Sequence, residues 1–157
     1  GLPSLPVQQK IISTIPSWWK ELSALPHTLI HNDFNPRNLA FRRTDCGLRL
    51  CAYDWELATI GVPQHDLAEL LCFVLPENVD RNTVQQYVDQ FLLALQKTHG
   101  CNISALEWQA GFRLSLRHLI VNRLPLYALI NKFKPQRFFA KTLQNWYRLN
   151  QWFGTHE

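Results

Sequence analysis

Apolar residues recur at helical spacing over most of this chain. Residues 8–26 carry such a pattern and predict a helix that breaks or begins around Pro16. After Gly61 the pattern predicts about four more helices. We expect them over residues 66–75, 80–100 and 104–124, and from near Pro135 onward.

Boundary residues support these helices. Pro76 follows the first of them and should end it, and Gly100 is a candidate C-cap for the second. Ser104 with Glu107 three residues later is a capping box at the start of the third.

Between the N-terminal helix and Gly61 the pattern changes to short, strand-like segments. Residues 27–31 predict a short apolar strand, and residues 38–43 and 48–56 predict two strands joined by a turn that contains Asp45 and Gly47. The expected fold class is therefore α+β and mostly α, with a small β-hairpin followed by about four helices.

The length of 157 residues fits a single domain over residues 1–157, and 46% hydrophobic residues can form a core. No apolar run reaches the length of about 18 residues that a transmembrane helix needs, and the N-terminus lacks a signal-peptide layout. We therefore expect a cytoplasmic protein with no membrane partner. The chain contains no methionine, so we expect a fragment, a processed product or an excised domain.

The four cysteines, Cys46, Cys51, Cys72 and Cys101, match no metal-binding or redox spacing. Cys72 lies in an apolar helical run and predicts a buried thiol. A Cys46–Cys51 bridge across the hairpin is an alternative, although it would be unusual in a cytosolic protein.

Positive charge is concentrated near the C-terminus. Residues 1–103 hold 8 Lys and Arg against 10 Asp and Glu, a net of −2, whereas residues 104–157 hold 8 against 2, a net of +6. A solvated basic helical surface is the favoured interpretation, and affinity for an anionic substrate or a nucleic acid is the alternative. Binding to nucleic acid is not favoured, because no groove-reading motif is present.

Two polar stretches flank the predicted hairpin, HNDFNPRN at 31–38 and YDWE at 53–56. Asn38 precedes the hairpin and Asp54 ends it, so the two side chains should approach each other. Their oxygens suit Mg²⁺, which takes few protein ligands. Asp33 on the same loop could then face a hydroxyl, which is the arrangement that phosphoryl transfer requires.

Each of these residues also has a simpler interpretation. A single Asp or Asn after a strand is commonly a turn residue or a helix cap. His31 alone would be a hydrogen-bonded structural histidine, and Asp66 reads first as an N-cap. The combined spacing is what favours a site.

The stretch H-x-D-x-x-x-x-N at 31–38, the strand-final Asp54, and G-x-P-x-x-D-L-A at 61–68 together resemble the aminoglycoside phosphotransferase and choline kinase-like family. The resemblance covers about residues 27–72. It implies a protein-kinase-like fold in which this chain is the C-terminal lobe.

By that resemblance Asp33 is the catalytic base, and Asn38 and Asp54 are the Mg²⁺ ligands. His31 braces the loop. Asp66 caps its helix and hydrogen-bonds to the backbone of the catalytic loop.

Two further side chains remain open. Arg37, inside the catalytic loop, could contact phosphate or point to solvent. Glu56 could touch a second metal indirectly or pair with a base.

The N-terminal lobe of that family carries a strand-borne Lys, its Glu partner and a loop over the phosphates. None of these features is found in the 157 residues, so we expect the N-terminal ATP lobe to be absent from this chain. The surface that would meet it should expose apolar side chains, and self-association is expected.

The resemblance implies an ATP-dependent kinase that transfers phosphate to a hydroxyl of a small metabolite, with ATP and Mg²⁺ bound. The alternative is a non-catalytic pseudokinase or interaction module. The basic C-terminal helices make polycationic aminoglycosides poor candidates for the substrate. Some of the six tryptophans could cage a quaternary amine, but tryptophans on apolar helix faces are more often core residues. A neutral or anionic hydroxylated metabolite is preferred.

Overall fold

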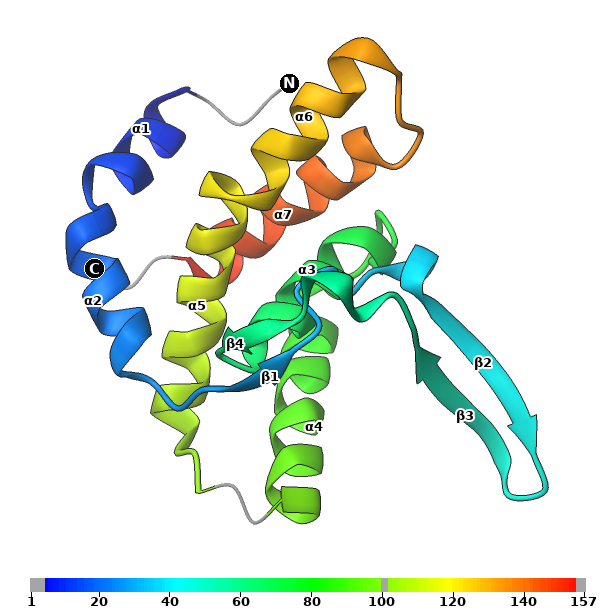
Figure 1. Ribbon diagram of the computed structural model, residues 1–157. Coiled ribbons are helices and arrows are strands. Elements are labelled where there is room, and N and C mark those ends of the chain that lie inside the picture. Colours follow the sequence, from blue (N-terminus) through cyan, green and yellow to red (C-terminus); the bar gives the residue numbers. More distant parts are fainter. Residues whose placement is uncertain (1–4, 100–101, 155–157) are drawn as a thin grey trace.

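A computed structural model describes residues 5–99 and 102–154, and most of these residues are helical (Figure 1). Seven α-helices are assigned in the described part of the chain. They are α1 (Leu5–Ser13), α2 (Ile15–Ala24), α3 (Gln64–Val74), α4 (Arg81–His99), α5 (Ala105–Val121), α6 (Arg123–Phe133) and α7 (Phe139–Phe153).

Two antiparallel strand pairs lie between α2 and α3 in the sequence. Strand β1 (Thr28–Ile30) pairs with β4 (Thr59–Gly61), and β2 (Leu39–Thr44) pairs with β3 (Gly47–Ala52). Short 3₁₀ helices, η1 (Pro36–Asn38) and η2 (Trp55–Leu57), precede β2 and follow β3. The chain therefore leaves the β1–β4 pair, makes the β2–β3 hairpin and returns to the same place.

The predicted hairpin is present, but its second strand ends at Ala52 and not at Glu56. Asp54 therefore follows the strand, and Trp55 and Glu56 belong to η2.

The register of the hairpin runs from Leu39 opposite Ala52 to Thr44 opposite Gly47, and Gly47 adopts a φ of 109° that an L-residue rarely tolerates. The hairpin projects away from the helical body (Figure 1). One of its faces carries Phe41 opposite Leu50, and both side chains are exposed.

The predictions for the rest of the fold need correction in two places. Five helices, not about four, follow Gly61 in the described residues, because the predicted helix over 104–124 ends at Val121 and α6 begins at Arg123. Pro125 gives the reason, since within a continuous helix it would lack the N–H that bonds to the carbonyl of Val121. In α6 it lies in the first turn, where that loss costs little. Strand β4 was also not predicted.

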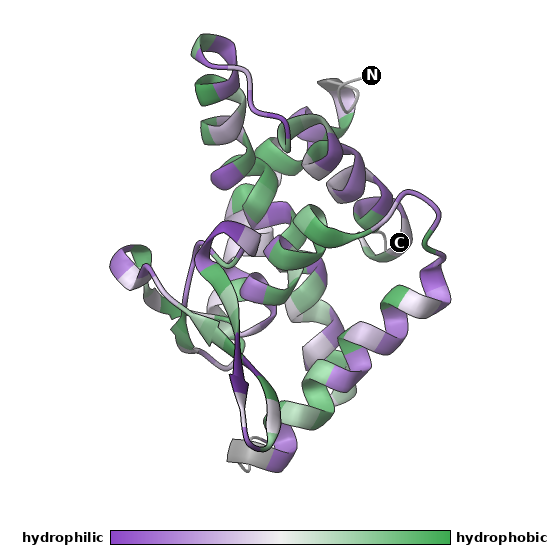
Figure 2. Ribbon diagram, turned by 90° about the vertical axis from the view of Figure 1, so that its right-hand side faces the viewer, coloured by the Kyte–Doolittle hydropathy of each residue, from purple (hydrophilic) through white to green (hydrophobic). Residues whose placement is uncertain are grey.

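Other local predictions are confirmed. The N-terminal helical segment is broken between α1 and α2, and Ser104 and Glu107 form the capping box of α5. Hydrophilic and hydrophobic residues alternate along the helices (Figure 2), as amphipathic packing requires. The predicted C-cap Gly100 lies outside the described residues.

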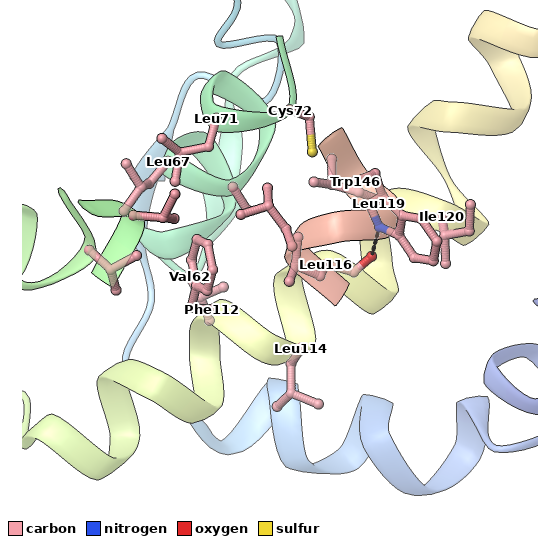
Figure 3. Packing of buried hydrophobic residues seen from close by; sticks show 14 of the residues in the cluster. Val62, Leu67, Leu71, Cys72, Phe112, Leu114, Leu116, Leu119, Ile120 and Trp146 are labelled. Atoms are coloured by element: carbon pink, nitrogen blue, oxygen red, sulfur yellow. Dashed lines mark hydrogen bonds between the residues drawn. The ribbon is translucent and has the colours of Figure 1, made fainter. Parts of the chain in front are cut away.

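A single apolar core includes residues from α1 to α7. Helix α3 packs against both α5 and α7, and Figure 3 shows their side chains meeting. Trp18, Trp108 and Trp146 are fully buried, and each indole N–H donates to a backbone carbonyl, at 2.8 to 2.9 Å. These three tryptophans are therefore core residues and cannot form a surface cage.

The cysteines of the described segments are free. Cys46 is exposed in the hairpin turn, Cys51 is partly buried on β3, and Cys72 is buried, so the alternative Cys46–Cys51 bridge does not form. Cys101 lies outside the described residues. Of the helices that the structure describes, none is long and apolar enough to span a membrane.

Candidate active site

The loop over residues 31–38 connects β1 to β2 and lies beside the start of α3. Asp66 in the first turn of α3 accepts hydrogen bonds from the backbone N–H groups of His31, at 2.7 Å, and Asn32, at 2.9 Å. Asn32 has a left-handed φ of 60°. The two bonds therefore hold a strained backbone conformation at the start of the loop.

Asp66 does not cap its helix. Pro63 occupies the N-cap position, and no side chain caps this helix. Both carboxylate oxygens of Asp66 bond to the loop instead. The expected bond to the loop backbone is present and the expected cap is not.

His31 ties the loop to the end of β3. Its side chain is fully buried, and its Nε2 lies 2.8 Å from the carbonyl oxygen of Tyr53. A carbonyl only accepts, so Nε2 carries the proton, and Nδ1 has no partner among the described residues. The ring packs 4.7 Å from that of Trp55. His31 thus has the surroundings of a structural residue.

Asn38 lies between the loop and the hairpin. Its amide nitrogen donates to the backbone oxygen of Asp33, at 2.9 Å, and to Asp33 Oδ2, at 2.8 Å. Its backbone oxygen accepts from the N–H of Tyr53 at 3.0 Å, which places Asn38 opposite the residue before Asp54. The hairpin therefore brings Asn38 near Asp54, as its length predicts.

Asp54 follows β3 with φ 62° and ψ 59°, a left-handed conformation that is costly for a residue other than glycine. Its side chain is exposed, and no described residue bonds to its carboxylate. The amide oxygen of Asn38 likewise accepts no hydrogen bond from the described residues. These uncommitted oxygens fit a hard cation that completes its shell with water and phosphate.

That donor set is small. The described residues contain no group of three His, Cys, Asp or Glu side chains that could hold a metal ion. A magnesium ion here would therefore depend on Asn38, Asp54 and oxygens from outside the protein.

The carboxylate of Asp33 is held unequally at its two oxygens. Oδ1 accepts from Nη2 of Arg123, from the hydroxyl of Tyr127 at 3.1 Å and from Nδ2 of Asn35 at 3.0 Å. Among the described residues, only Asn38 donates to Oδ2. The Asp33 side chain is 19% exposed, so it is reachable from solvent.

Glu69 is a site residue that the sequence analysis missed. It is 1% exposed in α3, accepts from the N–H of Phe34 and the hydroxyl of Tyr127, both at 2.9 Å, and lies 3.6 Å from Nε of Arg123. One signal was available, because Glu69 stands three residues after Asp66 and so on the same face of an apolar helix.

Arg123 and Tyr127 of α6 were also missed as site residues. Burial raises the pKa of the Tyr127 hydroxyl, and the Glu69 carboxylate adds to that rise, so the hydroxyl keeps its proton. Burial acts to lower the pKa of Arg123, whereas the neighbouring carboxylates of Glu69 and Asp33 raise it above its ordinary value. From the sequence, Arg123 was considered only as part of the positive charge near the C-terminus. The carboxylates of Asp33 and Glu69 neutralise part of that charge.

Arg37 contacts a side chain of its own loop and an aromatic ring near α7. Its Nε donates to Asn35 Oδ1 at 3.0 Å, and its guanidinium lies 4.7 Å from the ring centre of Phe138. Glu56 is exposed in η2 and makes no hydrogen bond with the described residues.

The model of a known family, described as the phosphotransferase enzyme family, matches residues 2–101. That match spans more than half of the chain and includes the loop, the hairpin and α3. The chain belongs to this phosphotransferase family. Helices α5 to α7, and with them Arg123 and Tyr127, follow the matched region.

A curated relative is similar to part of this chain. Acyl-CoA dehydrogenase family member 11 from Pongo abelii is 30% identical over 97 residues, which cover 55% of this chain and 12% of that protein. The chain therefore corresponds to a small part of this relative's length. No solved structure gave a significant match.

Proposed function

We propose that this phosphotransferase family member acts as an ATP-dependent small-molecule kinase and that residues 1–157 form its C-terminal, catalytic-loop lobe. The observation that carries the proposal is the meeting of Asp33, Asn38 and Asp54 at the base of one hairpin. The continuous core from α1 to α7 supports a single lobe.

In this proposal the acceptor hydroxyl of the substrate approaches Oδ2 of Asp33, the less occupied oxygen. The hydroxyl oxygen forms a bond to the γ-phosphorus of ATP, the bond from that phosphorus to the β–γ bridging oxygen breaks, and ADP leaves with the electron pair. Asp33 accepts the hydroxyl proton. Asn38 and Asp54 would hold Mg²⁺, which when bound neutralises charge on the phosphates.

The hydrogen bonds around the loop suit this role. Asp66 and Glu69 fix the loop backbone by accepting hydrogen bonds from its N–H groups. Asn38 places one hydrogen bond on Oδ2 of Asp33 and leaves room there for a second. Such fixed positions lower the cost of orienting the reacting groups.

The acceptor is proposed to be a neutral or anionic hydroxylated metabolite in the cytoplasm. Part of the basic C-terminal charge is already paired, since Arg123 binds Asp33 and Glu69, and Arg113 binds Glu21. The positive charges near the C-terminus that make no ion pair therefore attract an anion less strongly than the net charge of this region suggests.

A non-catalytic interaction module is the second candidate. The observation in its favour is the exposed apolar face of the hairpin, where Phe41 is 72% and Leu48 is 70% exposed. In this candidate the loop would stabilise the fold, and the hairpin would bind a second protein or an N-terminal lobe.

Phosphate transfer can be measured as ADP release over a panel of hydroxylated metabolites, in the chain and in the longest natural protein that contains it. Asp33→Asn should lower kcat by about 100-fold or more, the range of lost acid–base catalysis. Asp54→Asn should also lower kcat, because it removes a proposed Mg²⁺ ligand. Asp45→Asn in the exposed hairpin turn is the matched control and should retain activity.

Metal binding provides a readout that does not need a substrate. Titration with Mn²⁺ and ATP, followed by electron paramagnetic resonance, should show weaker binding for Asp54→Asn than for Asp45→Asn. Undiminished phosphate transfer in Asp33→Asn would contradict the assigned base. Absence of transfer and of metal–nucleotide binding in every form would favour the interaction module.

A further inference from the structure

Helix α6 reaches the candidate catalytic base from far along the chain. Arg123 and Tyr127 lie 90 and 94 positions after Asp33, and both place a donor group within hydrogen-bonding distance of its Oδ1. Both residues follow the region matched by the family, residues 2–101. The family resemblance therefore assigns neither of them a role.

The contacts separate the two oxygens of Asp33. Arg123 and Asn35 donate to Oδ1, and the hydroxyl of Tyr127 lies within hydrogen-bonding distance of it, whereas among the described residues only Asn38 donates to Oδ2. A carboxylate oxygen has two lone pairs, so Oδ1 has no good site left for a substrate hydroxyl, whereas Oδ2 has one. A carboxylate that is held at one oxygen can still accept a proton at its other oxygen.

Glu69 completes the arrangement. It lies 3.6 Å from Nε of Arg123, so a single guanidinium lies between two carboxylates, those of Asp33 and Glu69. The hydroxyl of Tyr127 is within hydrogen-bonding distance of both carboxylates but has one proton, so it donates to one at a time. Arg123 is thus needed to keep two nearby negative charges together.

The ring of Tyr127 is fixed by packing. It meets Phe73 of α3 edge-on, at 5.7 Å and 90°, and Phe138, immediately before α7, at 5.6 Å and 85°. Residues from three parts of the fold therefore determine where the hydroxyl points, and a displaced hydroxyl would need a change in the core.

We propose that Arg123 and Tyr127 are positioning residues that hold Oδ1 of Asp33 and so direct proton acceptance to Oδ2. The inference rests on the proposed kinase function of Asp33. It adds that residues beyond the family-matched region form part of the catalytic unit.

The test uses Tyr127→Phe, which removes the hydroxyl and keeps the ring. In a form of the protein that transfers phosphate, kcat should fall about tenfold or more, the size expected for losing a hydrogen bond to a charged group. The KM values for ATP and acceptor should stay within about twofold, because neither ligand contacts the hydroxyl in this proposal. Tyr87→Phe, at an exposed position of α4, is the matched control and should leave kcat and the KM values unchanged.

Arg123 is tested by two variants. Arg123→Gln should lower kcat more than Arg123→Lys, since lysine restores the charge without the planar fork that faces two carboxylates. A rise in KM with unchanged kcat in Tyr127→Phe or Arg123→Gln would overturn the inference, because it would place these residues in substrate binding. Unchanged kcat in folded variants would also overturn it.

A urea-unfolding cycle of Asp33→Asn, Arg123→Gln and the double variant separates this inference from the proposed function. If the effects of the two single variants on unfolding do not add up to the effect of the double variant, Asp33 and Arg123 are coupled, whether or not any phosphate is transferred. If the cycle shows coupling but no form of the protein has activity, the kinase proposal fails and positioning for catalysis fails with it. If the unmodified protein is active and the Tyr127→Phe kinetics do not change, only this inference fails.

Discussion

The carboxylate of Asp66 accepts the backbone N–H of His31 at 2.7 Å, across 35 residues of sequence. This bond joins the first turn of α3 to the start of the candidate catalytic loop. The second oxygen of Asp66 holds the next N–H, of Asn32. The conformation of the loop therefore depends on a charged group that belongs to a different element.

Replacing Asp66 with Asn should destabilise the fold. Asparagine offers one oxygen acceptor and turns an NH₂ toward a backbone donor, so one of two charge-assisted bonds is lost and one donor is left unpaired. We expect a decrease of about 3 kcal/mol in the free energy of unfolding, measured by urea denaturation. Asp89→Asn, an exposed carboxylate on α4, is the control and should change stability little. Equal stabilities of the two variants would contradict this role.

His118 should make the stability depend on pH. Burial, with a smaller contribution from His65, lowers the pKa of His118 from 6.5 to about 4. Between these values the unfolded chain binds a proton that the folded chain does not, so the contribution is full above pH 6.5 and is lost as the pH falls toward 4. His118→Gln should remove on the order of 2 kcal/mol of this pH dependence.

The comparison needs unfolding curves at several pH values between 4 and 7.5. His27→Gln, at an exposed histidine, is the matched control and should leave the slope unchanged. A His118→Gln variant with the same slope as the unmodified chain would show that another group is responsible.

The cysteines should differ in their reaction with iodoacetamide. Cys46 is exposed in the hairpin turn, whereas Cys72 is buried, and burial raises the pKa of its thiol, with Glu69 adding to that rise. Because the thiolate is the reactive form, Cys46 should be modified in the native protein and Cys72 only in denaturant. Site-resolved mass spectrometry measures both rates. Native labelling of Cys72 at the rate of Cys46 would contradict the burial.

The apolar hairpin face should promote association of the chain. Phe41, Leu48 and Leu50 are all exposed, and Phe41 lies opposite Leu50 on one face. We expect the apparent mass in size-exclusion chromatography to rise with concentration and the Phe41→Ser/Leu48→Ser variant to stay monomeric. Leu106→Ser, which changes an 82% exposed leucine on α5, should not reduce association. A concentration-independent monomer for the unmodified chain would contradict this prediction.

Local sequence determined much of the fold. The two strand-like segments joined by a turn at Asp45 and Gly47 predicted the hairpin, and Ser104 with Glu107 predicted the start of α5. Such features depend on residues a few positions apart, so they can be read without the fold. The break between α5 and α6 was missed, because apolar spacing continues across Asn122 and only the missing N–H of Pro125 marks it.

The sequence also predicted that Asn38 and Asp54 lie close together, because a hairpin returns the chain to the place where its first strand begins. It could not show that Arg123 and Tyr127 meet Asp33, because that contact depends on how α6 packs in the folded protein. The position of Glu69 on the helix could be read, but its partners could not, because a buried carboxylate is stable only where the fold supplies its donors. The sequence by itself determined which residues form the loop and the hairpin. The tertiary structure decided which side chains hold Asp33, because only packing brings groups 90 residues apart within hydrogen-bonding distance.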